Sequence, residues 1–229
     1  MARPERRARK ITMPSSAVKP PEYQSAYLQI RDMILFGNLV PGQSVTLSGL
    51  AETMQTGMMP VRDAVRRLTA EGALEAGGNR RVTVPEMTLD ALNEIAFARL
   101  TIEPRLTELA AAQMTNACLA DLEAFDAEVD AAIEAGNVER YLEYNYRFHF
   151  RLYEQSDAKI LIKIAASLWL QFGPSLRIVC GRFGTANLPD MHSEALEALR
   201  AQDIPKSVEA ISTDIRQGLD QVRLSKHHG

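Results

Sequence analysis

The sequence predicts a mainly α-helical protein in which an N-terminal winged helix-turn-helix domain precedes an all-α antiparallel helical bundle. Residues 21–85 show three helical segments and then a hairpin signal, the order typical of a winged helix. Residues 86–229 show six amphipathic segments with short connections, which favours a bundle. Residues 1–85 carry 12 Lys and Arg against 7 Asp and Glu, whereas residues 86–229 carry 14 against 22. A basic first part favours a polyanionic partner there.

The bulk composition is that of an ordinary globular protein. Of the 229 residues, 46% are hydrophobic and 24% are charged, which is usual for a soluble domain. The longest uncharged run is broken by Lys163 and is too short for a membrane span, so no membrane partner is expected. Residues 1–20 are basic and rich in Pro and Ser, which predicts a disordered tail rather than a secretory signal. Cys118 and Cys180 lie far apart, without a metal-binding spacing, and favour a reducing cytoplasm.

The winged domain is expected to start with a helix near Glu22 that Gly37 ends. The run "LVPGQSV" predicts a turn, and Ser48 is the expected N-cap of a short second helix. Pro60 suits the first turn of a third helix, which Gly72 would end. Two β-prone runs, "ALEA" and "RVTV", flank "GGNR" and predict the hairpin that forms the wing.

The bundle is expected to contain six helices, because breakers such as "EAGN" and "GTANLP" divide the remaining chain. Gly173-Pro174 is expected to kink or break the fourth of these helices. The predicted helices lie near residues 89–115, 118–135, 138–156, 159–182, 190–202 and 204–224.

The third helix of the winged domain carries candidate DNA contacts. Its apolar positions face the core, so Arg62 and Arg66, one turn apart, project from the other side together with Met59. Arginines at that spacing can pair with phosphates or with guanine edges in the major groove. The plainer interpretation is a solvated face with an ion pair between Asp63 and Arg67.

The predicted wing favours the DNA-binding interpretation. Arg80 and Arg81 stand at the tip of the hairpin, where cations are expected to reach backbone phosphates or the minor groove. A basic helix and a basic wing on the same small domain are a more specific pattern than either one alone.

His149 lies in an aromatic stretch, "NYRFHFRLYEQ", in a chain with only four histidines. Asn145 precedes it by four residues, so on a helix both side chains point the same way and can share a metal ion or a ligand oxygen. His192 opens a later helix, and Asp214 lies beside the apolar stripe of the last one. Taken singly, each residue has a plainer interpretation, since a lone histidine among aromatic residues is more often part of a core.

Residues 27–74 resemble the DNA-binding domain of GntR-family transcription regulators, and the resemblance continues through the wing. Its marks are the "I-x-x-G-x-x-x-P-G" turn, the "L-A" of the second helix, "P-V-R-x-A-x-x-x-L" in the third and "E-G-x-L" before the wing. Where the family usually carries Ser-Arg-Thr ahead of the proline, this chain has "GMM". The resemblance implies an operator contact at Arg62. Met58 and Met59 either read thymine methyl groups or mark weakened binding.

The chain from Asp90 onward resembles the FCD domain, the ligand-binding domain of FadR-type GntR regulators, in its smaller six-helix, VanR-like version. Arg99 and Glu103 match the "R-x-x-x-E" arrangement of that domain. The motif "N-x-x-F-H", which ends at His149, matches its "D-x-x-F-H", and His192 matches its "H-x-x-x-L-x-A-L" helix.

This second resemblance implies a metal site and an effector site. The ligands carried over position by position are Asn145, His149, His192 and Asp214. Asn stands for the usual Asp at the first position and Asp for the usual His at the last. The donor set suits a divalent ion, zinc first, with nickel or another transition metal as alternatives. Arg99 could face the same cavity and pair with a carboxylate effector through two N–H groups.

Together these features predict a homodimeric, cytoplasmic transcription regulator whose binding to a double-stranded operator responds to a small organic acid. In such families, repression relieved by the effector is the commoner arrangement. Two alternatives stay open from the residues alone. One is a DNA-silent ligand sensor, which Met58 and Met59 would explain. The other is a metalloenzyme that activates water at the bundle site, although no general acid or base stands at motif spacing near His149 or His192.

Overall fold

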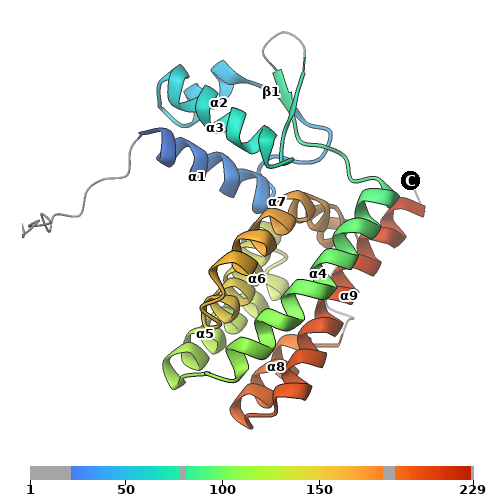
Figure 1. The fold of residues 1–229 in the computed structure, drawn as a ribbon. Helices are drawn as coiled ribbons and strands as arrows, with labels where there is room; N and C mark the ends of the chain where they lie inside the picture. The colour runs from blue at the N-terminus through green and yellow to red at the C-terminus, as the bar shows by residue number, and fades with distance from the viewer. Residues whose placement is uncertain (1–21, 78–80, 183–188, 228–229) are drawn as a thin grey trace, which may run out of the picture.

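The computed structural model describes residues 22–77, 81–182 and 189–227. A small N-terminal unit with a three-stranded sheet sits at one end of a bundle of long helices (Figure 1). The predicted mainly α architecture, with a winged helix-turn-helix followed by an antiparallel bundle, is confirmed. None of the described helices is long and apolar enough to cross a membrane.

The N-terminal unit follows the predicted order with one additional strand. Its elements are α1 (Glu22–Leu35), β1 (Ser44–Thr46), α2 (Leu47–Thr53), α3 (Met58–Ala70), β2 (Glu75–Ala76) and β3 (Arg81–Thr83). The sequence predicts only a turn where β1 lies. Strand β3 pairs antiparallel with both β1 and β2, and Val45 lies opposite Val82. The sequence does not predict β1 because this strand has only three residues, and it is stabilised by pairing with β3, which lies far from it in the sequence.

The N-cap of α2 is Thr46 rather than the expected Ser48. The side chain of Thr46 accepts a hydrogen bond from the backbone N–H of Gly49 at 3.0 Å. Thr46 has an extended backbone, with φ −94° and ψ 151°, which is the conformation that an N-cap residue needs. Ser48 already lies inside the first turn of α2, so its hydroxyl cannot take that role.

The bundle contains the predicted helices with end shifts of a few residues. They are α4 (Leu89–Ala111), α5 (Asn116–Glu134), α6 (Val138–Glu154), α7 (Lys159–Arg182), α8 (Met191–Arg200) and α9 (Ile204–His227). Of the two outcomes expected at Gly173-Pro174, a kink or a break, the break is wrong, because α7 continues through both residues. Proline costs a helical hydrogen bond, but Phe172 and Leu176 on either side are buried and hold the helix in the core.

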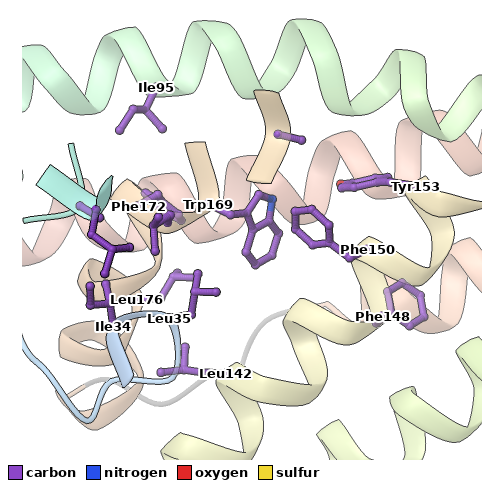
Figure 2. Close-up of a cluster of buried hydrophobic side chains, with 14 of the residues drawn as sticks. Ile34, Leu35, Ile95, Leu142, Phe148, Phe150, Tyr153, Trp169, Phe172 and Leu176 are labelled. Atoms are coloured by element: carbon purple, nitrogen blue, oxygen red, sulfur yellow. The ribbon is translucent and has the colours of Figure 1, made fainter. Parts of the chain in front are cut away.

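The N-terminal unit rests directly on the bundle, through α1 against α7. Leu35 of α1 belongs to the same buried cluster as Phe172 of α7 (Figure 2). A Cβ atom added at Gly173 would lie 3.5 Å from the Leu35 side chain, an ordinary van der Waals distance, so α7 passes close to the end of α1 here. Phe36 also meets Tyr146 of α6 edge to face, with ring centroids 6.0 Å apart. The two units therefore share one hydrophobic core rather than being joined only by a linker.

Replacing Gly37 with alanine should destabilise the protein more than the same change at Gly136. Both residues have a positive φ, 78° and 62°, which costs an L-residue roughly 1–2 kcal/mol. A Cβ at Gly37 would lie only 2.4 Å from Cδ of Arg177, whereas Gly136 has open space. We expect Gly136→Ala to lower the free energy of unfolding by about 1 kcal/mol and Gly37→Ala by at least about 2 kcal/mol. Urea denaturation measures both, and equal losses would show that Arg177 moves aside freely.

Candidate functional site

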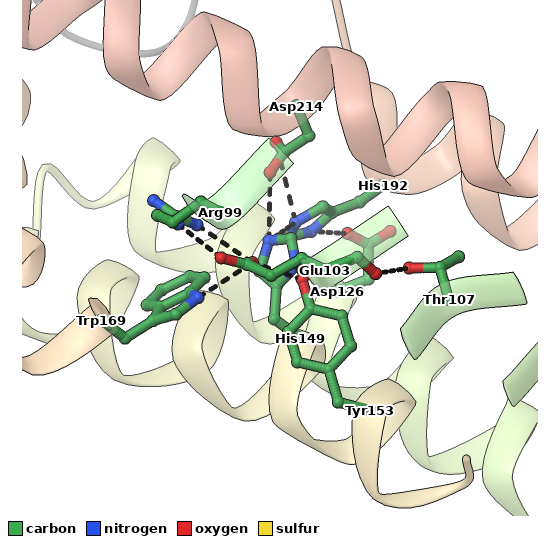
Figure 3. Close-up of polar contacts among 9 residues, drawn as sticks. All are labelled: Arg99, Glu103, Thr107, Asp126, His149, Tyr153, Trp169, His192 and Asp214. Atoms are coloured by element: carbon green, nitrogen blue, oxygen red, sulfur yellow. Dashed lines mark hydrogen bonds and ion pairs between the residues drawn. The ribbon is translucent and has the colours of Figure 1, made fainter. Parts of the chain in front are cut away.

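Side chains from three helices converge inside the bundle. His149 comes from α6, His192 from α8 and Asp214 from α9 (Figure 3). His149 Nε2 lies 3.0 Å from Asp214 Oδ2 and 3.4 Å from His192 Nε2. One candidate ligand atom from each residue fits within 4.8 Å of the other two. Two imidazoles and a carboxylate at these distances can hold a divalent ion.

The helices place these side chains for local reasons. His149 lies on the buried face of α6, and its ring is fully buried. His192 is in the first turn of α8, which Asp190 begins by accepting a hydrogen bond from the Ser193 N–H at 2.9 Å. Phe148 stacks on the His192 ring, with centroids 3.9 Å apart. Capping and stacking together fix the direction in which His192 points.

The outer nitrogen of each histidine has its own partner. Nδ1 of His192 lies 3.1 Å from Asp126 Oδ1. Nδ1 of His149 lies 3.2 Å from the Tyr153 hydroxyl, which donates to Glu103 Oε2 at 2.6 Å. When Nδ1 carries the proton, Nε2 presents a lone pair, as metal-binding histidines require. Both Nε2 atoms point into the cluster.

Sequence reasoning missed Asp126. It lies on α5, 66 residues before His192, and no motif links the two positions. Asp126 is one of six acidic residues on α5, so its residue type gives no specific signal in the sequence. The contact therefore follows from the packing of α5 against α8.

The charges of the cluster are interdependent. Burial lowers the pKa of His149, against the opposing effect of Asp214. Burial alone would also lower the pKa of His192, but the hydrogen bond with Asp126 and the charge of Asp214 raise it overall. Burial opposes ionisation of Asp214, yet its hydrogen bond with His149 and the two imidazoles lower its pKa to about 2. Asp214 is therefore an anion at neutral pH.

Arg99 lies beside this cluster in a buried ion pair with Glu103. Its Nε and one terminal nitrogen donate to the two Glu103 oxygens at 2.6 and 3.2 Å. Glu103 also accepts from Trp169 Nε1 at 3.0 Å. The guanidinium lies 4.5 Å from the Trp169 ring and 4.8 Å from the Phe172 ring. Arg99 thus borders the predicted cavity, but two of its N–H groups already bind Glu103.

A cavity of about 290 Å³ opens next to the cluster. Asn145, the fourth predicted ligand, lines it and is 7% exposed. Within the described part of the chain, no hydrogen bond reaches the Asn145 amide. The other lining residues are Arg99, Asp126, Val129, Asp130, Ile133, Tyr141, Trp169, Phe172, Leu176, Pro189, Asp190, Met191, His192, Asp214, Ile215, Gln217, Gly218 and Gln221.

The outer face of α3 presents most of the predicted DNA contacts. Met58 and Met59 are exposed in the first turn, and Arg62 lies within 3.9 Å of the Met59 sulfur. Arg66 is exposed and pairs with Asp63 at 2.8 Å.

The ion pair weighed between Asp63 and Arg67 does not form. Arg67 instead binds Glu71 at 2.9 Å and stacks over the Tyr27 ring. Arg81 begins β3 and is exposed, whereas Arg80 lies outside the described residues. Arg62 and Arg66 of α3 and Arg81 of β3 are thus exposed on the N-terminal unit.

Fold and site together define a class of protein: a DNA-binding regulator with a ligand-binding helical domain. Residues 22–84 match the gntR family of bacterial regulatory proteins, and residues 94–217 match the FCD domain. The HTH-type transcriptional regulator McbR of Escherichia coli K12 is 30% identical over 178 residues, covering 76% of this chain and 80% of McbR. The uncharacterized HTH-type transcriptional regulator YdhC of Bacillus subtilis 168 is 28% identical over 142 residues, covering 62% of this chain and 63% of YdhC.

Solved structures agree. E. coli McbR/YncC has a TM-score of 0.85 at 25% identity and covers 91% of this chain and 100% of its own. A GntR regulator from Rhodococcus sp. RHA1 has a TM-score of 0.73 at 17% identity over 87% of this chain and 96% of its own, which supports the fold alone.

The chain therefore belongs to the GntR family of transcription regulators and carries a C-terminal FCD domain. Proteins of this family bind DNA operators and usually act as dimers. Its homologues are transcription regulators and not enzymes, so the metalloenzyme weighed from the residues alone is wrong.

Replacing Glu103 with glutamine should destabilise the protein strongly. Glu103 is fully buried, and its loss of charge leaves the buried Arg99 cation without a counterion. Breaking a buried ion pair in this way costs about 3–5 kcal/mol. The exposed pair of Arg105 with Glu108 provides a control, and Glu108→Gln should cost under about 1 kcal/mol. Chemical denaturation compares the variants. A loss at Glu103 no larger than the loss at Glu108 would mean that water or the fold compensates Arg99.

Proposed function

We propose that this regulator binds its operator as a homodimer through residues 21–85. A divalent ion and a small organic acid, bound within residues 86–229, control that binding. The observation that carries the proposal is the convergence of His149, His192 and Asp214 beside a cavity whose wall also supports the DNA-reading unit. Because its target is bacterial DNA, the protein would work in the cytoplasm. The tail predicted over residues 1–20 lies outside the described residues.

The reading surface would be α3 with the wing. Arg62 is the first candidate for a base or phosphate contact, because no carboxylate among the described residues pairs with it. Arg66 can join once it leaves Asp63, a surface ion pair worth under about 1 kcal/mol. Met58 and Met59 would face thymine methyl groups. Arg80 and Arg81 would contact the backbone from the wing.

The ion would be held by Nε2 of both histidines and an Asp214 oxygen, with the Asn145 amide oxygen as the fourth and weakest ligand. The donor set fits zinc, and it also suits nickel or another transition metal. Asp126 and Tyr153 support this role, since each occupies the outer nitrogen of a ligating histidine. Bound there, the ion supplies a Lewis-acidic centre for an effector oxygen and neutralises the Asp214 charge.

An organic acid would enter the cavity with its carboxylate toward the ion. Arg99 keeps further N–H groups beside those that Glu103 takes, so it can contact the same carboxylate. Trp169 and Phe172 would cover the apolar part of the molecule. We expect the bound effector to relieve repression.

Helix α7 offers the physical link between the two functions. Trp169, Phe172 and Leu176 line the cavity, and Phe172 and Leu176 share a buried cluster with Leu35 of α1. A ligand that prefers one position of α7 would bias the placement of α1, and with it the placement of the two reading heads in a dimer.

Replacing Arg62 with alanine should weaken operator binding. The loss of a phosphate or base contact costs about 1–3 kcal/mol and lowers the salt dependence. Fluorescence anisotropy of the full chain with DNA from upstream of its own gene, against scrambled DNA, measures the effect. The exposed Arg105 of α4 is the control, because Arg105→Ala removes the same charge far from α3. Unchanged specific binding in Arg62→Ala would refute the assigned contact but not the family.

Replacing Asp126 with asparagine should weaken metal binding without unfolding the bundle. Partners of ligating histidines typically contribute 10- to 100-fold in metal affinity, and we expect about tenfold because the asparagine oxygen still accepts. The zinc affinity is measured by competition with a zinc-chelating dye. Asp121→Asn, on the same helix but on the surface, should leave it unchanged. His192→Ala should abolish high-affinity binding, and retained zinc affinity in that variant would show that the ion lies elsewhere.

A further inference from the structure

The cavity is lined by several carboxylates, and their charge limits which effectors can bind there. Asp126, Asp130, Asp190 and Asp214 all line it. Among the described lining residues, Arg99 is the only arginine or lysine, and it is already paired with Glu103. Because the Arg99–Glu103 pair is neutral overall, the four carboxylates outweigh a divalent ion by two charges. An acid with no cationic group would therefore enter a site of the same sign as its own.

Two of the carboxylates are available to a ligand. Asp214 and Asp126 are engaged by the histidines. Asp130 makes no ion pair or hydrogen bond with any described residue, and one oxygen of Asp190 caps α8, leaving the other. Burial raises the pKa of Asp130, as do the nearby charges of Asp126 and Asp190. Asp130 and Asp190 thus form a rim of uncompensated negative charge at the mouth of the cavity.

Away from Asp130 and Asp190, the cavity is lined by the Asn145 amide and by apolar side chains. Asn145 lines the cavity, and its amide makes no hydrogen bond with another described residue, so the amide can bind a ligand there. If its oxygen meets the ion, its NH₂ group remains to donate to a carboxylate. Beyond it, Trp169, Phe172 and Ile215 provide an apolar wall. The volume of about 290 Å³ is at the lower end for small-molecule sites.

We propose that the effector is zwitterionic: an amino acid with an apolar side chain rather than a simple organic acid. Its carboxylate faces the ion and Asn145, and its ammonium group faces Asp130 and Asp190. Its side chain packs on Trp169 and Phe172. The inference rests on the proposed function, because it uses the same cavity and ion, and it narrows the ligand to a class that carries both charges.

The test compares acids that differ only in the amine. The zinc-loaded full-length protein is titrated calorimetrically with L-phenylalanine and 3-phenylpropionate, and with L-leucine and 4-methylpentanoate. In at least one pair, the amino acid should bind about fivefold or more tightly than the acid that lacks the amine. Asp130→Asn should reduce that preference to about twofold or less. Glu94→Gln, which removes an exposed carboxylate of α4 outside the cavity, should leave it intact.

The outcomes separate this inference from the function on which it rests. Equal or tighter binding of the deaminated acids overturns the zwitterionic effector, and so does a lack of binding by all four compounds to a protein that does bind zinc. Failure to bind zinc or operator DNA, measured on the same preparation, would instead overturn the proposed function. A preference for the amine that survives Asp130→Asn would also contradict the inference, because the ammonium group would then lie elsewhere.

Discussion

The buried ion pair between Arg99 and Glu103 is the interaction on which the rest of the bundle depends. Neither charge can remain in a protein interior without compensation. Glu103 is therefore bound by Arg99, by the Tyr153 hydroxyl and by the Trp169 indole, which come from α4, α6 and α7. This network aligns three helices at one level of the bundle. Through Tyr153 it also sets the orientation of His149, so the candidate metal centre and the core share one set of hydrogen bonds.

A second constraint is that α7 serves two surfaces. One side of it lines the cavity with Trp169 and Phe172, and Gly173 lies against α1. Packed interiors transmit displacement because they contain few voids. A displacement of side chains at the cavity therefore has a short path to the N-terminal unit through α7, which continues without a break past Pro174. In this arrangement the ligand site and the DNA-reading unit are two faces of one core.

The sequence predicts several residues of the site, but not the hydrogen bonds and ion pairs that determine their charges. The spacing of Asn145 and His149 follows from helical periodicity, and His192 and Asp214 came from resemblance to a family motif. In the structure, His149, His192 and Asp214 do come together. Arg99 lines the cavity, but its ion pair with Glu103, which the sequence did not predict, limits how many of its N–H groups a ligand can use. No sequence motif marks Asp126 or Asp130. Each lies at the site only because helices distant in sequence pack beside α5.

What the sequence by itself determined is whatever depends on local order. The helices, the turn at Pro41-Gly42, the basic face of α3 and the family motifs all follow from neighbours a few residues apart. Strand β1 and the cap at Thr46 were missed because pairing with β3 and the backbone angle at residue 46 decide them. Only the tertiary structure decided that four aspartates line one cavity and that Arg99, the one arginine among its described lining residues, already pairs with Glu103. The net charge of a cavity is a sum over residues that lie far apart in the sequence, and only folding brings them close enough to interact.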